Sequence, residues 1–256
     1  MKIAVILFPG LNCEEETKVA VESAGMSAEI IRWNEPAGRL AEFQGFVIPG
    51  GWSYEDRIRA GVIATKNPIM EEIRKQADTG KPVLGICNGA QILVESGMIP
   101  NIKGRLEMAL APNINPRIRG YYCTWIRMKV NKAKTTAFNM LFSSDTVINV
   151  PVAHGEGRFT TKDKGVLREL EKNHQIAFQY CTAEGQIAEG FPANPNGSVM
   201  GIAGITNIRG NVMALMPHPE RANFQWQVPG AGFSGEDTAG PGRLIFDSMR
   251  RYIENV

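Results

Sequence analysis

The run Val83-Leu84-Gly85-Ile86-Cys87-Asn88-Gly89-Ala90-Gln91-Ile92-Leu93 decides the fold. An apolar segment leads into a cysteine that is followed at once by a helical pattern. Strand, sharp turn and helix in this order form a nucleophile elbow, here with cysteine in place of serine. Gly85 and Gly89 let the strand and the helix approach closely, and the helix N-terminus presents N–H groups to a thiolate. The run therefore predicts an α/β fold with Cys87 at the carboxyl end of a strand.

Apolar runs and helical patterns alternate throughout the first hundred residues, on both sides of the elbow. Strand-like runs cover residues 3–8, 28–33, 45–49 and 82–86. Helical patterns cover residues 14–24, 68–79 and 90–96. This alternation predicts a parallel sheet with crossover helices. In such a sheet, the loops at the carboxyl ends of the strands line the ligand crevice.

The pattern changes after Pro100 to strand-like segments separated by polar and glycine-rich turns. These segments cover residues 121–130, 146–150, 175–180, 202–207 and 212–216. They predict an antiparallel extension of the sheet, with a hairpin turn at 207–211. A loop at 223–242 and a last amphipathic helix at 243–253 follow. We therefore expect a single α/β domain over residues 1–256, a three-layer open sheet that is mostly parallel with an antiparallel extension.

The composition gives no reason to expect a nucleic-acid or membrane partner. Lys plus Arg number 28 and Asp plus Glu 26, which leaves a formal charge of +2 and no strong electrostatic field. The sequence starts with a strand-like run rather than a signal peptide, and no apolar run approaches membrane-spanning length, so we expect a cytoplasmic location. The four cysteines lie far apart and only three histidines are present. This pattern predicts free thiols and no metal site.

Cys87 and the segment around His218 together provide the residue types of a catalytic triad. His218 lies between two prolines and Glu220 follows two residues later, so an extended segment would place both side chains on one side. The carboxylate would then orient the imidazole, in the chain order Cys, His, Glu. Taken separately, Cys87 is equally well read as a small buried hydrophobe and Pro-His-Pro as a surface turn.

Acyl transfer also requires hydrogen-bond donors for the developing oxyanion. The turn after the third strand, Pro49-Gly50-Gly51, and the turn at Asn88 can provide them. We assign the Gly51 and Asn88 N–H groups to the oxyanion hole, and Gly50 and Gln91 to substrate binding. Gln91 lies four residues after Cys87 and therefore on the same side of the helix. The alternatives are an ordinary tight turn for Gly50-Gly51 and a solvated helix position for Gln91.

Three motifs occur in one order: Pro-Gly-Gly at 49–51, Gly-Ile-Cys-Asn-Gly-Ala-Gln at 85–91 and Pro-His-Pro-Glu at 217–220. In order and spacing they resemble the class I glutamine amidotransferases. More narrowly, the chain resembles the family of glutaminase subunits of phosphoribosylformylglycinamidine synthase, which act in purine biosynthesis. The runs that carry this narrower resemblance span nearly the whole length: Pro-Gly-Leu-Asn-Cys at 9–13, Pro-Gly-Gly-Trp-Ser-Tyr-Glu-Asp at 49–56, Ala-His-Gly-Glu-Gly-Arg-Phe at 153–159 and Asn-Pro-Asn-Gly-Ser at 194–198.

The resemblance implies a class I amidotransferase fold, a Cys-His-Glu triad and glutamine as the substrate. It further implies that ammonia passes to a synthetase subunit that makes formylglycinamidine ribonucleotide with ATP and magnesium, and that a third small subunit bridges the two chains. No cofactor is then expected in this chain itself, because ATP and magnesium belong to the synthetase.

Two other classes of function fit parts of the sequence. A different cysteine-dependent enzyme of the same architecture would share the elbow, and a non-catalytic interaction subunit would share the fold without turnover. A broken triad would favour the second, and all three members are present. Cys13 is expected near the site without a chemical role. The loop of His154 and Glu156 is expected to form a wall or docking surface, and the 223–242 loop has no assigned role.

Overall fold

The computed structural model describes residues 1–232 and 235–256 of the chain. Its larger sheet contains β1 (Lys2–Leu7), β2 (Ser27–Arg32), β3 (Gly45–Ile48), β4 (Val83–Ile86), β6 (Tyr122–Val130), β7 (Val147–His154), β9 (Ile176–Cys181), β10 (Ile202–Thr206) and β11 (Val212–Leu215). These nine strands lie in the order β2-β1-β3-β4-β11-β10-β9-β6-β7. A small second sheet pairs β5 (Ala109–Ala111) with β8 (Arg158–Thr160).

The sheet has a parallel half and an antiparallel half, as expected. Strands β2, β1, β3, β4 and β11 are parallel to one another, and β10, β9, β6 and β7 continue the sheet with antiparallel pairs. The prediction that residues 212–216 belong to the antiparallel extension was wrong. Strand β11 runs parallel to β4, with Val212 opposite Val83 and Leu215 opposite Ile86. The hairpin between β10 and β11 reverses the chain direction, so that the antiparallel half begins at β10.

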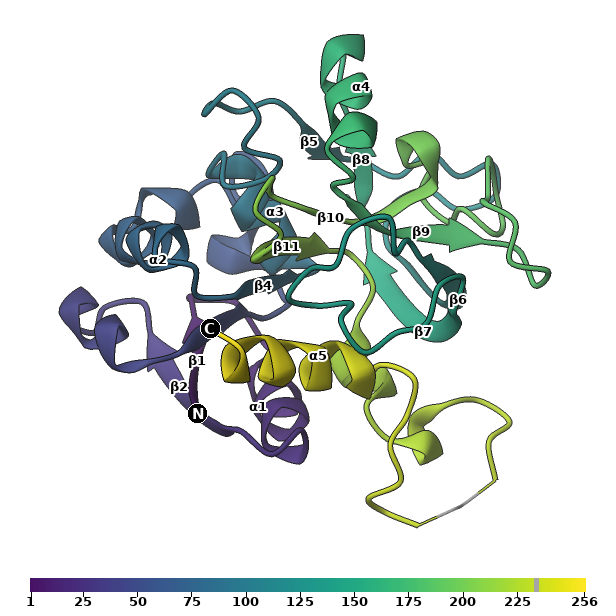
Figure 1. Ribbon diagram of the computed structural model, residues 1–256. Helices are drawn as coiled ribbons and strands as arrows, with labels where there is room; N and C mark the ends of the chain where they lie inside the picture. Colours follow the sequence, from purple (N-terminus) through teal and green to yellow (C-terminus); the bar gives the residue numbers. More distant parts are fainter. Residues whose placement is uncertain (233–234) are drawn as a thin grey trace.

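Helices cover both faces of the parallel half. The α-helices are α1 (Glu14–Ser23), α2 (Pro68–Asp78), α3 (Asn88–Glu95), α4 (Lys164–Lys172) and α5 (Arg243–Glu254). Figure 1 shows α1 and α5 on one side of strands β1 and β4, and α2 and α3 on the other. This arrangement is the predicted three-layer α/β fold. That the whole chain is a single domain stays a prediction.

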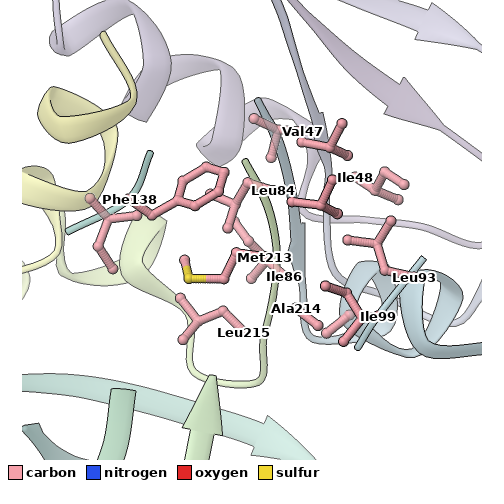
Figure 2. Packing of buried hydrophobic residues seen from close by; sticks show 14 of the residues in the cluster. Val47, Ile48, Leu84, Ile86, Leu93, Ile99, Phe138, Met213, Ala214 and Leu215 are labelled. Carbon is pink, nitrogen blue, oxygen red and sulfur yellow. The ribbon is translucent and has the colours of Figure 1, made fainter. Parts of the chain in front are cut away.

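The central strands are buried on both faces, which explains their continuous apolar sequences. Every residue of β3, β4 and β11 is buried. Figure 2 shows Leu84 and Ile86 of β4 packed with Met213 of β11, between Phe138 on one side and Leu93 of α3 on the other. Burial of this kind contributes about 25 cal/mol per Å² of apolar surface. The site therefore rests on rigid strands.

Helix α4 was absent from the sequence-based prediction. Asp163 caps it by accepting a hydrogen bond from the Gly165 N–H at 2.7 Å. Only Val166 and Leu170 are buried along its length. Its three apolar residues, Val166, Leu167 and Leu170, recur at helical spacing, so the sequence carried a signal for this helix that the prediction did not use.

The 223–242 segment is irregular, as expected, over the part that the structure describes. It contains a 3₁₀ turn, η6 (Gln225–Gln227), and a single bridge between Phe224 and Ala239. Phe224 and Trp226 stack with their ring centroids 6.0 Å apart. Residues 233–234 of the predicted loop lie outside the described residues. Among the helices described, none is long and apolar enough to span a membrane.

Candidate active site

Cys87 occupies a sharp turn between β4 and α3. Its backbone has φ 51° and ψ −106°, a conformation that side-chain-bearing residues rarely adopt. A Cβ on Gly85 would lie 2.5 Å from the Gly89 carbonyl oxygen, and one on Gly89 would overlap the carbonyl of Ile48. Only glycine fits both positions, so the predicted elbow is present. Cys87 is 6% exposed and lines the cavity described below.

Sheet order brings the candidate residues together. Strands β3, β4 and β11 are adjacent and parallel, so their carboxyl ends lie at the same edge. Gly50 follows β3, Cys87 follows β4 and His218 follows β11. A Cβ on Gly50 would come within 2.9 Å of His218 Cε1 and 3.3 Å of Cys87 Cβ. The three segments therefore pack against one another, although 168 residues of sequence separate Gly50 from His218.

His218 and Glu220 form a buried pair. The His218 Nδ1 and Glu220 Oε1 atoms are 2.5 Å apart, and the residues are 2% and 1% exposed. The expectation of an extended segment was wrong: a 3₁₀ turn, η5 (Pro219–Ala222), follows His218. Proline at its first position favours such a turn, and the turn folds the carboxylate back onto the imidazole. The other ring nitrogen, Nε2, has no hydrogen-bond partner in the described part of the chain.

The charges around His218 favour its protonated form. Burial alone would lower the pKa of the imidazole, but the Glu220 carboxylate and the Cys87 thiolate raise the pKa well above its ordinary value. A protonated imidazole in turn stabilises a neighbouring thiolate. The protonated His218 can therefore supply a proton to a leaving group while Cys87 acts as a nucleophile.

The two candidate oxyanion donors are the N–H groups of Gly51 and Asn88, which belong to turns at the same edge of the sheet as His218. Gly51 has φ 137°, and a Cβ there would lie 2.5 Å from Leu11 Cα, so the position requires glycine. Asn88 is the first residue of α3, where an N–H has no acceptor within the helix. The structure thus brings Gly50, Gly51 and Asn88 to the same edge of the sheet as Cys87. Their roles stay predictions.

A cavity of about 380 Å³ opens at this edge. Its wall includes Asn12, Cys13, Gly51, Trp52, Asp56, Cys87, Gln91, Tyr121, Ala153, His154, Gly155, Glu156, His218 and Arg221. Gln91 lies on the cavity side of α3, as its spacing from Cys87 predicted. Its side chain already bonds the protein, because Nε2 donates to the Glu156 carbonyl at 2.8 Å and Oε1 accepts from Asn88 Nδ2 at 2.7 Å.

Cys13 and His154 line the cavity, as expected, whereas sequence reasoning missed Arg221. Arg221 Nη2 lies 3.0 Å from Cys13 Sγ and 3.1 Å from Glu16 Oε1. Burial raises the pKa of the Cys13 thiol, which keeps it protonated and a poor nucleophile. Burial also lowers the pKa of His154 to about 3, so this imidazole is neutral. Position was the available signal for Cys13, which directly precedes α1, and for His154, which ends β7. Arg221 lies within η5 and had no such signal.

One group of side chains could in principle bind a metal ion. Ligand atoms of Cys13, His218 and Glu220 lie within 4.8 Å of one another. However, His218 and Glu220 are joined by a hydrogen bond, and the Arg221 guanidinium lies beside Cys13. A divalent cation would meet this fixed positive charge. The arrangement fits proton transfer better, and the absence of a metal role stays a prediction.

Comparison with known proteins agrees with this geometry. Residues 1–253 match the model of the CobB/CobQ-like glutamine amidotransferase domain. The chain therefore belongs to this family of glutamine amidotransferases, as the motifs indicated. It is 50% identical over 99% of its length to the phosphoribosylformylglycinamidine synthase subunit PurQ of Methanothrix thermoacetophila, covering 98% of that protein. It is 44% identical to the Pyrococcus furiosus protein of the same name, over 87% of this chain and 90% of that one.

A solved structure supports the fold as well. The structure of PurLQS from Thermotoga maritima contains a chain that is 30% identical, with a TM-score of 0.76 and 98% of both chains covered. A structure described as a putative GMP synthase subunit from Thermoplasma acidophilum, at 16% identity and a TM-score of 0.55, shares the fold. Both likenesses extend over nearly the whole of this chain, including the antiparallel half of the sheet.

Proposed function

We propose that this chain is the glutaminase subunit of phosphoribosylformylglycinamidine synthase and hydrolyses glutamine to glutamate and ammonia. The observation that carries the proposal is the placement of Cys87, at a strained elbow, beside the buried His218–Glu220 pair. Relatives named as the PurQ subunit of this synthase match almost the whole chain. Site chemistry and relatives therefore support the same reaction.

In the proposed mechanism, the Cys87 thiolate attacks the carbon of the glutamine side-chain amide. The protonated His218 gives its proton to the departing nitrogen, which leaves as ammonia, and a thioester remains on Cys87. His218 then takes a proton from water, whose oxygen attacks the thioester carbon and releases glutamate. Glu220 orients the imidazole and stabilises its charged form in both steps.

Backbone donors stabilise the oxyanion of each tetrahedral intermediate. We assign this role to the N–H groups of Gly51 and Asn88, and substrate contact to Gly50 and Gln91. Removing one such donor typically costs about a hundredfold or more in turnover. The glycines at 50 and 51 support the assignment because neither tolerates a Cβ beside the site.

The ammonia is used by a partner rather than by this chain. The Thermotoga maritima assembly is named PurLQS, which supports a complex of this chain with a synthetase subunit and a small bridging subunit. We assign ATP and magnesium to the synthetase, no cofactor and no metal ion to this chain, and a cytoplasmic location to the complex. No nucleic-acid or membrane partner is proposed.

Covalent labelling tests the proposal directly. A glutamine analogue with an electrophilic side chain should form one adduct, on Cys87, detected by mass spectrometry of the digested chain. Cys87→Ala should form none, and Cys13, the second thiol of the cavity, should stay unlabelled. Labelling without release of ammonia from glutamine in the presence of the synthetase would indicate a different cysteine enzyme of this architecture. An absence of both would indicate a non-catalytic subunit.

A further inference from the structure

Two thiols line the cavity at the carboxyl edge of the parallel strands. Within the part of the chain that the structure describes, Cys13 and Cys87 are the two cysteines of the cavity wall, and both are buried. Cys87 is the candidate nucleophile, whereas Cys13 has no part in the proposed hydrolysis. A second thiol beside a reactive one is the usual arrangement of a redox-sensitive pair.

The two cysteines border one space beside Gly50. A Cβ on Gly50 would lie 3.2 Å from Cys13 Sγ and 3.3 Å from Cys87 Cβ, so the absence of that side chain leaves the space between them open. The Cys13 N–H donates to the Gly50 carbonyl at 3.3 Å, which holds its backbone there. A disulfide requires Cβ atoms about 3.5–4.5 Å apart. Because Cys13 lies just before α1 and outside any strand, rotation of its side chain with a small local shift suffices.

The imidazole of His218 adjoins both thiols. Ligand atoms of Cys13 and His218 lie within 4.8 Å of each other, and His218 Cε1 would lie 2.9 Å from a Cβ on Gly50. Burial lowers the pKa of His218, but the Glu220 carboxylate and both thiols, those of Cys87 and Cys13, raise it. A protonated His218 stabilises the Cys87 thiolate, which is the form of cysteine that peroxides oxidise.

Cys13 is a protonated thiol beside a fixed cation. Burial raises the pKa of the Cys13 thiol, whereas the neighbouring His218 lowers it. Arg221 Nη2 lies 3.0 Å from Cys13 Sγ, and its positive charge stabilises a thiolate as the proton leaves. Cys13 is therefore unreactive at rest and becomes a nucleophile once a neutral imidazole accepts its proton.

We infer that Cys13 is a resolving thiol, which forms a reversible disulfide with Cys87 after hydrogen peroxide has oxidised Cys87. The Cys87 thiolate first attacks one peroxide oxygen, the O–O bond breaks, and His218 protonates the departing hydroxide to water. This leaves a sulfenic acid on Cys87 and a neutral imidazole. His218 then takes the proton of Cys13, whose sulfur attacks the sulfur of Cys87. The S–S bond forms, the S–O bond breaks, and His218 returns the proton to the departing hydroxide. The two thiols lose two electrons in all, and one peroxide is reduced to two water molecules.

The disulfide stops the nucleophile from reacting and also protects it. A sulfenic acid that meets more peroxide proceeds to sulfinic and sulfonic acids, which a dithiol does not reduce, whereas a dithiol reduces a disulfide back to thiols. The loss of glutaminase turnover on oxidation rests on the proposed function. The disulfide itself rests only on the positions of Cys13, Cys87 and His218.

Peptide mapping tests the disulfide. The reduced full chain is treated with an equimolar amount of hydrogen peroxide, its remaining thiols are blocked with N-ethylmaleimide, and the unreduced digest is analysed by mass spectrometry. We expect a linked Cys13–Cys87 peptide that dithiothreitol releases, with Cys123 and Cys181 blocked as free thiols. Glutamine hydrolysis, assayed with the synthetase present, should be lost as the linked peptide forms and should return with dithiothreitol.

Matched variants separate the disulfide from simple oxidation. In Cys13→Ser we expect no linked peptide, a sulfenic acid on Cys87 that dimedone traps, and a loss of turnover in excess peroxide that dithiothreitol no longer reverses, relative to the turnover of the untreated variant. Cys181→Ser removes a buried thiol outside the cavity and should respond to peroxide as the wild type does.

Three results with the wild-type chain would overturn the inference: Cys87 that stays reduced, Cys87 that is oxidised while Cys13 remains free, or disulfides formed with Cys123 or Cys181 instead. A chain that forms the linked peptide but releases no ammonia from glutamine before oxidation, with the synthetase present, would support the disulfide and overturn the proposed function.

Discussion

At the scale of single residues, the chemistry depends on positions that few residue types tolerate. Cys87 has a positive φ at the elbow, and Gly50 lies where any side chain would meet the ring of His218. His218 and Glu220 are buried at a hydrogen-bonding distance of 2.5 Å. Strain and burial of this kind lower stability, and they persist at sites where the geometry is needed for function.

The strain at Cys87 predicts an unusual order of stabilities. Glycine adopts positive φ without a steric cost, so Cys87→Gly should relieve about 1–3 kcal/mol of strain while losing about 0.5–1 kcal/mol through chain flexibility. We expect Cys87→Gly to be about 1 kcal/mol more stable than Cys87→Ala in urea denaturation. Ala90→Gly, within α3, should instead destabilise by about 1 kcal/mol. Equal stability of the two Cys87 variants would show that the elbow is unstrained.

The His218–Glu220 pair predicts graded effects on turnover. Glu220→Gln keeps an acceptor for Nδ1 but removes the charge that stabilises the imidazolium, so turnover should fall by about a hundredfold or more. His218→Ala removes the proton donor itself and should cost more. Because the Glu220 carboxylate raises the pKa of His218, the pH at which this group titrates in a rate profile should also fall in Glu220→Gln. Turnover within about twofold of wild type would show that Glu220 is not the orienting group.

Burial of neutral His154 predicts a loss of stability in acid. Its pKa is lowered to about 3 in the folded chain, against about 6.5 when unfolded. Below pH 6.5 the unfolded chain therefore binds a proton that the folded chain does not, and stability decreases as pH falls toward 3. The cost is about 1.4 kcal/mol per pH unit, or about 2 kcal/mol at pH 5. Urea denaturation at pH 7 and pH 5 should show a smaller decrease for His154→Gln than for wild type.

At the scale of elements, the sequence predicted most strands and helices but not how they become neighbours. The parallel half was predictable because its strands, such as β3 and β4, are continuous apolar runs that end in glycine turns. The parallel pairing of β11 with β4 was not, since hydrophobic periodicity carries no information on which strands lie side by side. That pairing is the feature that places His218 next to Cys87.

The remaining differences have local physical causes. The 3₁₀ turn after His218 was missed because Pro-His-Pro also fits an extended segment, and a short turn leaves no periodic pattern. The place of Asp56 in the cavity wall was missed because it depends on three consecutive left-handed residues that are not glycine. Non-glycine residues with positive φ are uncommon, so sequence alone does not predict such a turn.

At the scale of the whole molecule, the candidate site is assembled from loops at one edge of the sheet. The cavity wall draws on residues 12–13, 51–56, 87–91, 121, 153–156 and 218–221. Trp52 and Tyr121 lie at its rim, 44% and 50% exposed, with their rings 5.9 Å apart. A subunit that docks on this rim would contact the same loops that carry the candidate oxyanion donors.

Docking of the synthetase should therefore control glutaminase turnover. Ammonia made without a synthetase is wasted, and the segments able to respond are loops, namely residues 50–56 and 154–159. Realigning one backbone donor of the oxyanion hole changes turnover by about a hundredfold or more, so a partial realignment suffices for a tenfold effect. We expect the isolated chain to hydrolyse glutamine slowly, and the synthetase with its bound nucleotide to raise the rate constant by at least about tenfold, or about 1.4 kcal/mol. Steady-state assays with the partner titrated in would measure this rise. Comparable turnover with and without the partner would mean that the site is preformed and that ammonia loss is controlled elsewhere.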